Sequence, residues 1–239
     1  MRQIFKHPVR ALAALLVLLI PAGVAAAYEV EPMRMILDLG AGRTTAVINI
    51  RNTREEALPV EIVMKRRIVQ ADGSQEFVPA EEDFSIFPPL ALIQPGQSQA
   101  IRISYIGDPN VRDSQAFIAE VQEVPVSRED FTGVVFAYNF GVAVYVRANE
   151  AQADVSLAEV RDTPQGLALR VTNAGTDFAM LGELDLRIRA GGESVRLSPA
   201  QVAELVENPI IPPHASRDFL LGIDDLPDGP VEVSLGRSF

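Results

Sequence analysis

The stretch Phe131-Thr-Gly-Val-Val-Phe-Ala-Tyr-Asn-Phe-Gly-Val-Ala-Val-Tyr-Val-Arg147 alternates between large apolar and smaller side chains over an unusual length. Because side chains repeat every two residues along a β-strand, the large ones share one face. These residues are Val134, Phe136, Tyr138, Phe140, Val142 and Val144. A typical strand has about 5–6 residues, so a pattern of roughly fourteen is longer than the core of one small sandwich needs.

Two interpretations of this long strand are open at this point. In the first, it is a central strand that packs only against its own domain. In the second, it is an edge strand whose apolar row, beginning at Val134, is offered to another polypeptide by strand addition. The rest of the chain has to decide between them.

The first 27 residues have the features of a secretory signal peptide. A basic segment, residues 1–10, precedes an apolar run at 11–20 and the small residues that a signal peptidase requires, Ala25 and Ala27. We expect cleavage before Tyr28 and export of the mature chain. An uncleaved membrane anchor is the alternative, which is disfavoured because the apolar run stops early at Pro21 and ends in small residues. After cleavage we expect no membrane insertion.

The composition excludes several classes of protein. The net charge is −11, and loss of the first 27 residues, which hold three basic residues and no acid, makes it three units more negative. Nucleic acid is excluded as a partner because its phosphates would be repelled. The chain has no cysteine, which excludes disulfides and a structural thiolate metal site. Stability must therefore come from buried apolar side chains.

From Tyr28 onward, short alternating segments are separated by turn residues, with hardly any helical periodicity. Strand patterns occur at residues 33–39, 46–50, 58–64, 100–105 and 117–124, before the long stretch. Asp72-Gly73 indicates a tight hairpin, because glycine accepts a positive φ. About seven strands in roughly 120 residues is typical of an immunoglobulin-like sandwich.

The strand pattern lapses at residues 148–153, and we place a domain boundary there, between residues 28–148 and 149–239. Strand patterns resume at residues 167–171, 184–188, 219–221 and 231–235. Ser198 followed by Pro199 predicts the start of one short helical turn. The sequence thus predicts an all-β protein of two immunoglobulin-like β-sandwich domains, the second smaller than the first.

Several motifs together resemble the PapD-like family of periplasmic pilus-assembly chaperones, which work in chaperone–usher systems. Pro88-Pro89-Leu90, followed by Gln94-Pro95-Gly96-Gln97, is similar to the family's Pro-Pro and Pro-Gly segment. Residues 116–125 resemble the family's strand ending in Glu-Ile-Pro, and 131–147 falls where the family has its donor strand. Residues 210–217 look like a turn of the family's second domain. The resemblance spans the whole mature chain.

The resemblance implies a periplasmic protein in which two immunoglobulin-like domains form a boomerang, and which is not an enzyme and needs no cofactor. Pilus subunits of such systems are sandwiches that lack their last strand. The chaperone lends its own strand until an outer-membrane usher passes the subunit to the fibre. This supports the strand-addition interpretation, with donor residues Val134, Phe136, Tyr138 and Phe140. We also expect weak self-association of the unliganded protein, which would cover its apolar strand.

The family holds the subunit's C-terminal carboxylate with two basic residues, an arginine on the first strand and a lysine on the donor strand. Arg34 is at the matching place on the first strand, and its planar fork suits a carboxylate. A solvated surface charge is the alternative for Arg34. Counted back from Arg147, the lysine position holds Ala143. Arg147 is the tentative second partner, with Lys65 and Arg66 as further candidates.

Two other classes of function remain for comparison. An enzyme with a catalytic triad is poorly supported, because the mature chain has a single histidine, His214, which we expect in an exposed turn. The alternative to a chaperone is a structural or adhesive protein of the cell surface built from complete sandwiches. A fibre subunit would carry a free, alternating N-terminal extension, whereas here strand patterns begin within a few residues of Tyr28.

Overall fold

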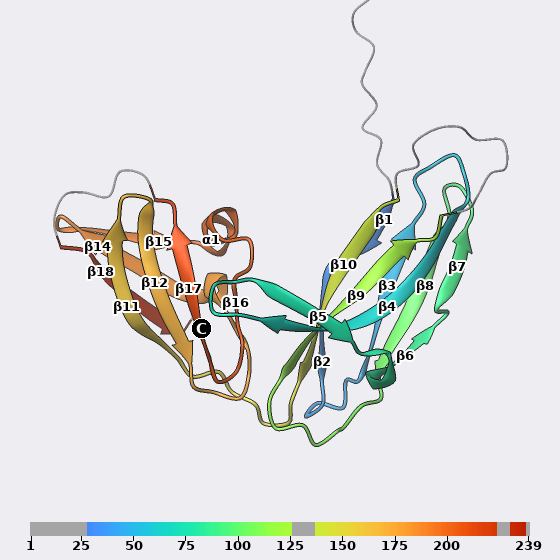
Figure 1. Ribbon diagram of the computed structural model, residues 1–239, viewed down its shortest axis with the longest axis horizontal. Helices are drawn as coiled ribbons and strands as arrows, with labels where there is room; N and C mark the ends of the chain where they lie inside the picture. The colour runs from blue at the N-terminus through green and yellow to red at the C-terminus, as the bar shows by residue number, and fades with distance from the viewer. Residues whose placement is uncertain (1–27, 126–136, 224–229, 238–239) are drawn as a thin grey trace, which may run out of the picture.

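The computed structural model describes residues 28–125, 137–223 and 230–237. Figure 1 shows two β-sandwiches that meet at an angle, with their strands rising as the two arms of a boomerang. The predicted all-β, two-domain architecture is confirmed. Within the described ranges, no helix is long and apolar enough to span a membrane.

The described residues of the first domain form two sheets. One has the strand order β1-β3-β8-β6, and the other has the order β2-β10-β9-β4-β5, with β7 also paired to β4. The elements are β1 (Glu29–Glu31), β2 (Arg34–Asp38), β3 (Thr45–Arg51), β4 (Leu58–Val69), β5 (Gln75–Pro79), the 3-10 helix η1 (Glu81–Asp83), β6 (Phe84–Phe87), β7 (Leu90–Ile93), β8 (Ser98–Tyr105), β9 (Gln115–Glu123) and β10 (Asn139–Arg147).

The core of the first domain follows from the alternation of its strands. Each strand turns every second side chain inward, and the two sheets bury these rows against each other. On β10 the buried residues are Val142, Val144 and Val146, and on β9 they include Phe117. Each large apolar side chain so buried contributes about 1.5–3 kcal/mol. The outward-facing rows of β2, β10, β9 and β4 are left for other contacts.

The second domain is smaller and has sheets of order β11-β12-β17 and β15-β14-β18, plus the short pair β13-β16. The predicted boundary near Ala148 falls in the segment between β10 and β11, and we keep it as a proposal. The elements are β11 (Val155–Thr163), β12 (Gly166–Asn173), β13 (Ala179–Met180), the 3-10 helix η2 (Leu181–Glu183), β14 (Leu184–Ala190), β15 (Glu193–Leu197), α1 (Pro199–Leu205), β16 (Ile210–Ile211), β17 (Ala215–Leu221) and β18 (Glu232–Arg237).

The predicted helical turn after Ser198 is confirmed as α1. The Ser198 hydroxyl accepts a hydrogen bond from the Gln201 backbone N–H at 3.3 Å, and the Gln201 side chain accepts one from the Ser198 backbone N–H at 2.9 Å. This reciprocal capping box satisfies two backbone donors that the first turn leaves unpaired. Val202 anchors the helix on the second core.

The two domains repeat one buried asparagine motif. Asn52 directly follows β3 and Asn173 ends β12, and both side chains are fully buried. Each amide donates to the carbonyl four residues later, at 2.7 Å in both domains, and to the end of a distant strand, Ile93 or Ile211. Each asparagine oxygen accepts from the backbone N–H two residues on. The same device thus ties a strand end to a turn in both sandwiches.

The turn beside each asparagine is also repeated. Gly96 follows Pro95 with φ +71°, and His214 follows Pro213 with φ +52°. A positive φ favours glycine. The backbone conformation of His214 is therefore less favourable than that of Gly96, which has the same place in the first domain. The His214 side chain is 55% exposed, which confirms the expected exposed turn. Its Nε2 lies 2.9 Å from Oδ1 of Asp113 in the first domain.

Apolar and polar contacts join the domains. Tyr145 of β10 packs with Phe178, Met180 and Ile210 of the second domain in a small buried cluster. Figure 1 shows the β4–β5 hairpin reaching across to the strands of the second domain. At its tip, the Ala71 carbonyl accepts a hydrogen bond from the backbone N–H of Asp218 at 2.8 Å. The angle between the arms is therefore held by side-chain packing and by backbone bonds.

We expect Asn173→Ala to destabilise the second domain by about 3 kcal/mol, because it leaves several buried backbone groups without partners. Urea unfolding followed separately for the two domains measures this change. Asn49→Ala, on the exposed face of β3, is the matched control. Equal stability of the Asn173 variant and the wild type would contradict the structural role of the motif.

Candidate functional site

β10 has one edge that is only partly covered. On one side, β9 pairs with it antiparallel from Asn139 to Val146, while on the other side β2 pairs with it in parallel only from Ala143 to Arg147. The Ala143 N–H donates to the Met33 carbonyl at 3.0 Å, on the β2 side. Because backbone direction alternates, the peptide groups of Asn139 and Gly141 point toward this same side. No described strand pairs with them there, so β10 has an open edge that ends at Arg34.

The apolar row of β10 passes from the core to the surface along this open edge. Phe140 is half-buried, with its ring centroid 4.7 Å from that of Tyr28. Tyr138 is 45% exposed. The predicted donor residues Val134 and Phe136 lie outside the described residues. Of the two predicted donor residues that the structure describes, Phe140 packs against the core and Tyr138 lies at the surface.

A polar cluster fixes the start of β10. Arg54 donates to both carboxylate oxygens of Glu123, at 2.6 and 2.8 Å, and Glu123 accepts from the Tyr138 backbone N–H at 3.2 Å. The hydrogen bond from Arg54 is the largest influence that lowers the pKa of Glu123. The Tyr28 hydroxyl lies 2.8 Å from the Tyr138 carbonyl, and burial raises the pKa of this hydroxyl. Tyr138 is therefore held by its backbone, which leaves its side chain outside.

The outward face of the same sheet carries a row of four aligned residues. In the strand register, Arg34 of β2 is opposite Ala143, Ala143 is opposite Ile118, and Ile118 is opposite Lys65. Directly paired residues share a face of the sheet. Ala143, at the position where the resemblance leads one to expect lysine, is thus the immediate neighbour of Arg34.

The three candidates for a second cation are all paired with carboxylates. Lys65 shares the face of Arg34, but its Nζ lies 2.8 Å from Glu120. Arg66 points to the other face, 3.1 Å from Asp83 and over the ring of Phe117. Arg147 lies 2.8 Å from Asp177 of the second domain and 4.0 Å from Asp38. Within the described residues, none of the three contacts Arg34.

Arg34 itself contacts the second domain. Its Nη2 lies 2.8 Å from Oε1 of Glu183, which ends η2, and both side chains are about half-exposed. A carboxylate of the same chain therefore already rests on the predicted carboxylate anchor. An exposed pair of this kind contributes at most about 1 kcal/mol and exchanges partners readily.

Two residues that the sequence analysis did not single out lie beside this pair. Tyr145 is only 3% exposed, and its ring lies 4.4 Å from that of Phe178. Arg67 of β4 reaches across β9, and its Nη1 donates to the Tyr145 hydroxyl oxygen at 3.3 Å. The two-residue repeat of β4 puts Arg67 on the same face of the sheet as Lys65. This repeat was the sequence feature that could have identified Arg67. It did not show how far the side chain reaches.

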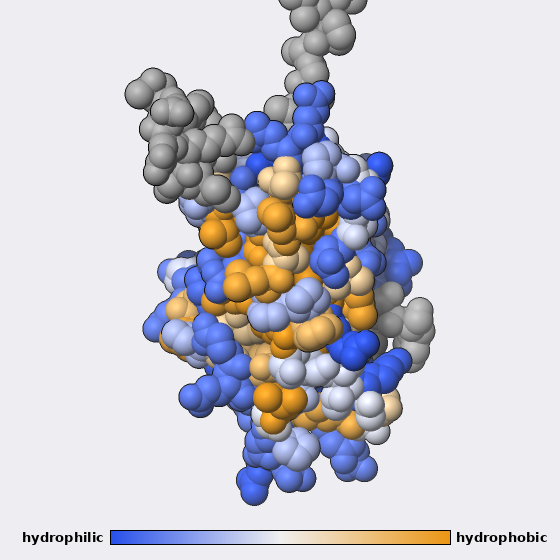
Figure 2. Space-filling view, turned by 90° about the vertical axis from the view of Figure 1, so that its right-hand side faces the viewer, coloured by the Kyte–Doolittle hydropathy of each residue, from blue (hydrophilic) through white to orange (hydrophobic). Residues whose placement is uncertain are grey.

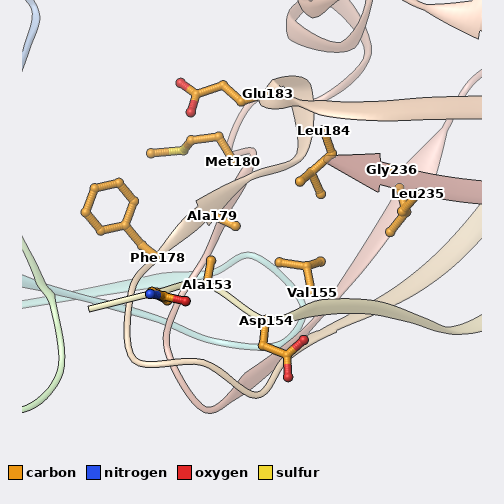
Figure 3. Close-up of a pocket in the computed structure, with 11 residues that line it drawn as sticks. Ala153, Asp154, Val155, Phe178, Ala179, Met180, Glu183, Leu184, Leu235 and Gly236 are labelled. Atoms are coloured by element: carbon orange, nitrogen blue, oxygen red, sulfur yellow. The ribbon is translucent and has the colours of Figure 1, made fainter. Parts of the chain in front are cut away.

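Two hollows adjoin the domain interface. A pocket of about 530 Å³ lies in the second domain, and Glu183 is part of its lining. Figure 3 shows Phe178, Met180 and Glu183 directed to the side away from Val155, Leu184 and Leu235. A smaller pocket of about 310 Å³ is lined from both domains and includes Arg67 and Phe178. No group of side chains suited to a metal ion occurs among the described residues.

The first domain also exposes apolar side chains on β7, at the sheet edge opposite β2, and at the end of β6, a strand of the other sheet. Phe87, Leu90 and Leu92, which we call the β7 patch, are 71%, 59% and 62% exposed. Figure 2 shows hydrophobic residues gathered on the side of the molecule that carries β7 in Figure 1. Contiguous exposed apolar surface is typical of protein–protein contact sites.

A comparison with known protein families identifies the family to which this fold belongs. The family model for the pili and flagellar-assembly chaperones, PapD N-terminal domain, matches residues 28–152, which is more than half of the chain. The chain belongs to the PapD-like family of pilus-assembly chaperones. The family is non-enzymatic and periplasmic. The resemblance seen in the sequence is confirmed.

Solved structures show the same fold at low sequence identity. The class 5 fimbriae chaperone CfaA matches with a TM-score of 0.57 and 14% identity, covering 89% of this chain and 100% of that chain. A structure of the Salmonella enterica SafA pilin in complex with the SafB chaperone matches with a TM-score of 0.56 and 18% identity, covering 89% and 93%. The CsuC–CsuE chaperone–tip adhesion subunit complex of Acinetobacter baumannii matches at 0.54 and 14%, covering 89% and 99%. No curated protein sequence matches the chain.

The cluster at the start of β10 predicts a pH effect. Because the pKa of Glu123 is lower in the folded protein, its bond to Arg54 stabilises the fold at neutral pH. That contribution is lost as the pH falls below the ordinary value of 4.5 and through the folded pKa. We therefore expect Glu123→Gln to be less stable than wild type at pH 7 and to approach it in acid. Urea unfolding at both pH values measures this, with the exposed Glu61→Gln as control. A constant stability difference across the range would contradict this role of Glu123.

Proposed function

We propose that this protein is a periplasmic chaperone that folds and caps pilus or fimbrial subunits by donor-strand complementation and delivers them to an outer-membrane usher. The observation that carries the proposal is the open edge of β10, which ends beside Arg34. An open strand edge is a template for another chain, and its end is marked by a cation.

The geometry sets the direction of the incoming strand. A client strand that bonds to the peptide groups of Asn139 and Gly141 lies in line with β2, in the same position of the sheet. Its far end then meets Arg34 at the start of β2. For a C-terminal carboxylate to reach that guanidinium, the client strand must run parallel to β10. Its final residue then stops at the first residue of β2.

Two kinds of contact would hold the client. Backbone hydrogen bonds along the open edge contribute about 0.5–1.5 kcal/mol each and tolerate many client sequences. The exposed end of the apolar row, with Tyr138, adds burial in a groove that lacks a strand. The carboxylate on Arg34 fixes the register, because a slip of one residue would present the wrong face of the strand.

The remaining partners require further surfaces. Delivery to an usher needs a surface that stays accessible while the client covers the β10 edge, and the β7 patch meets this requirement because β6 and β7 lie away from that edge. Weak self-association through the open edge of β10 would protect it before a client arrives. Export through the signal peptide, residues 1–27, brings the chaperone to the periplasm.

Removal of Arg34 tests the anchor. We expect Arg34→Ala to stay folded, since its pair with Glu183 is half-exposed, but to lose about tenfold to a hundredfold in client affinity with one charge-assisted hydrogen bond. Co-expression with a subunit of its host's pilus and recovery of soluble complex measure the loss. Arg51→Ala, whose guanidinium pairs with Glu29 on the other sheet, is the control. Wild-type recovery with the Arg34 variant would remove this residue from the site.

Removal of Glu183 tests whether it competes with the client. Because its carboxylate occupies Arg34 in the unliganded protein, we expect Glu183→Gln to raise client affinity severalfold. Titration of one purified subunit against both proteins measures the change. Asp218→Asn, which breaks an exposed pair with Arg170 elsewhere in the second domain, serves as control. A lower affinity would show instead that Glu183 orients Arg34 for binding.

A further inference from the structure

We propose that the Tyr145 hydroxyl, backed by Arg67, is the second donor to the client's C-terminal carboxylate and replaces the lysine that Ala143 does not supply. This inference rests on the proposed function and names further residues of the same site. It assigns binding to Tyr145 and a positioning role to Arg67.

The hydroxyl of Tyr145 has a hydrogen to give. Its oxygen accepts from Arg67 Nη1 at 3.3 Å, and no acceptor for its own hydrogen occurs among the described residues. The residue is 3% exposed, and its ring is fixed against Phe178. A buried hydroxyl without an acceptor is costly unless a ligand provides one. A carboxylate is an acceptor at both of its oxygens.

The positive charge of Arg67 lies next to this hydroxyl and is not balanced by a carboxylate among the described residues. Its Nε donates to Gln75 at 2.7 Å, its Nη2 donates to Asn208 at 2.6 Å, and its Nη1 donates to Tyr145. All three partners are neutral, and no described carboxylate lies within ion-pair distance of Arg67. A guanidinium that donates to a hydroxyl oxygen makes that hydroxyl a stronger donor in turn. This excess of positive charge occurs in a chain whose net charge is −11.

Tyr145 and Arg34 lie on the same face of the sheet, on the neighbouring strands β10 and β2. Tyr145 is two residues beyond Ala143 on β10, and Arg34 pairs with Ala143 on β2. Both side chains lie on the same face of adjacent strands, so an aromatic ring and a long arginine side chain at these positions can reach one ligand. Burial raises the pKa of Tyr145, the charges of Arg67 and Arg34 lower it, and Glu183 raises it again. The Glu183 carboxylate on Arg34 thus lies close enough to Tyr145 for its charge to raise the pKa of this hydroxyl.

Ala143 makes room for this arrangement. Its methyl group packs on the edge of the cluster formed by Tyr145, Phe178 and Met180. The cation that would stand on β10 beside Arg34 is thus missing, and the charge comes from β4, two strands away, through Tyr145. The clamp then consists of the Arg34 fork on one side and a polarised hydroxyl on the other.

The test compares two forms of one probe, a synthetic peptide of alternating threonine and valine that ends in a free carboxylate or in an amide. Binding to the mature protein is followed by NMR titration. We expect Tyr145→Phe, which keeps the ring and removes only the hydroxyl, to bind the acid about tenfold more weakly and the amide as wild type does. Arg67→Gln should show a smaller loss of the same kind. Tyr105→Phe, whose hydroxyl donates to the Asp108 carbonyl away from the site, is the matched control. Ala143→Lys added to Tyr145→Phe should restore binding of the acid.

The outcomes separate this inference from the function on which it rests. Failure of the wild type to bind the acid more tightly than the amide, or no loss with Arg34→Gln, would contradict the proposed function itself. A loss with Arg34→Gln but none with Tyr145→Phe would overturn only the role of the hydroxyl. An equal loss of acid and amide binding in Tyr145→Phe would show a structural role in the domain interface, and would overturn the inference as well.

Discussion

The short parallel pairing between β2 and β10 is the constraint on which the rest of the site depends. β10 is a nine-residue strand, and β2 covers only its last five residues. A backbone edge without a partner is costly in a folded protein unless water or another chain satisfies it. In the proposed function, the point at which β2 begins decides where an incoming strand stops, and Arg34 is the residue at that point. In the proposed function, strand addition and carboxylate binding both follow from this one change in pairing.

The second domain converts this edge into a site with a defined end. Its residues Phe178 and Met180 cover Tyr145, and Glu183 reaches Arg34 from η2. The interface is partly apolar and partly ionic, so it can hold the angle between the arms while its exposed ion pair exchanges partners. Arg34 and Arg67 place positive charge at the domain interface of a strongly acidic protein, and this local charge would favour binding of a client carboxylate.

Much of this architecture could be predicted from local patterns. The alternation of the strands, the hairpin at Gly73 and the capped turn at Ser198 depend on neighbouring residues, and the structure contains all three. Counting back from Arg147 also identified Ala143, which the structure places directly opposite Arg34. This count succeeded because the two-residue repeat of a strand and its pairing register determine which residues are neighbours. The reach of Arg67 to Tyr145 and the pair between Arg34 and Glu183 could not be predicted. Both depend on how far long side chains extend and on how two domains meet, which no local pattern encodes.

Amide hydrogen exchange along β10 tests the central claim most directly. Asn139 and Gly141 direct their N–H groups to the open edge, whereas Phe140 and Val142 direct theirs to β9. In the unliganded protein, the first pair should exchange fast and the second pair slowly. On binding a pilus subunit captured from the host periplasm, Asn139 and Gly141 should become protected while the other two change little. Unchanged fast exchange at Asn139 and Gly141 in a stable complex would contradict strand addition at this edge.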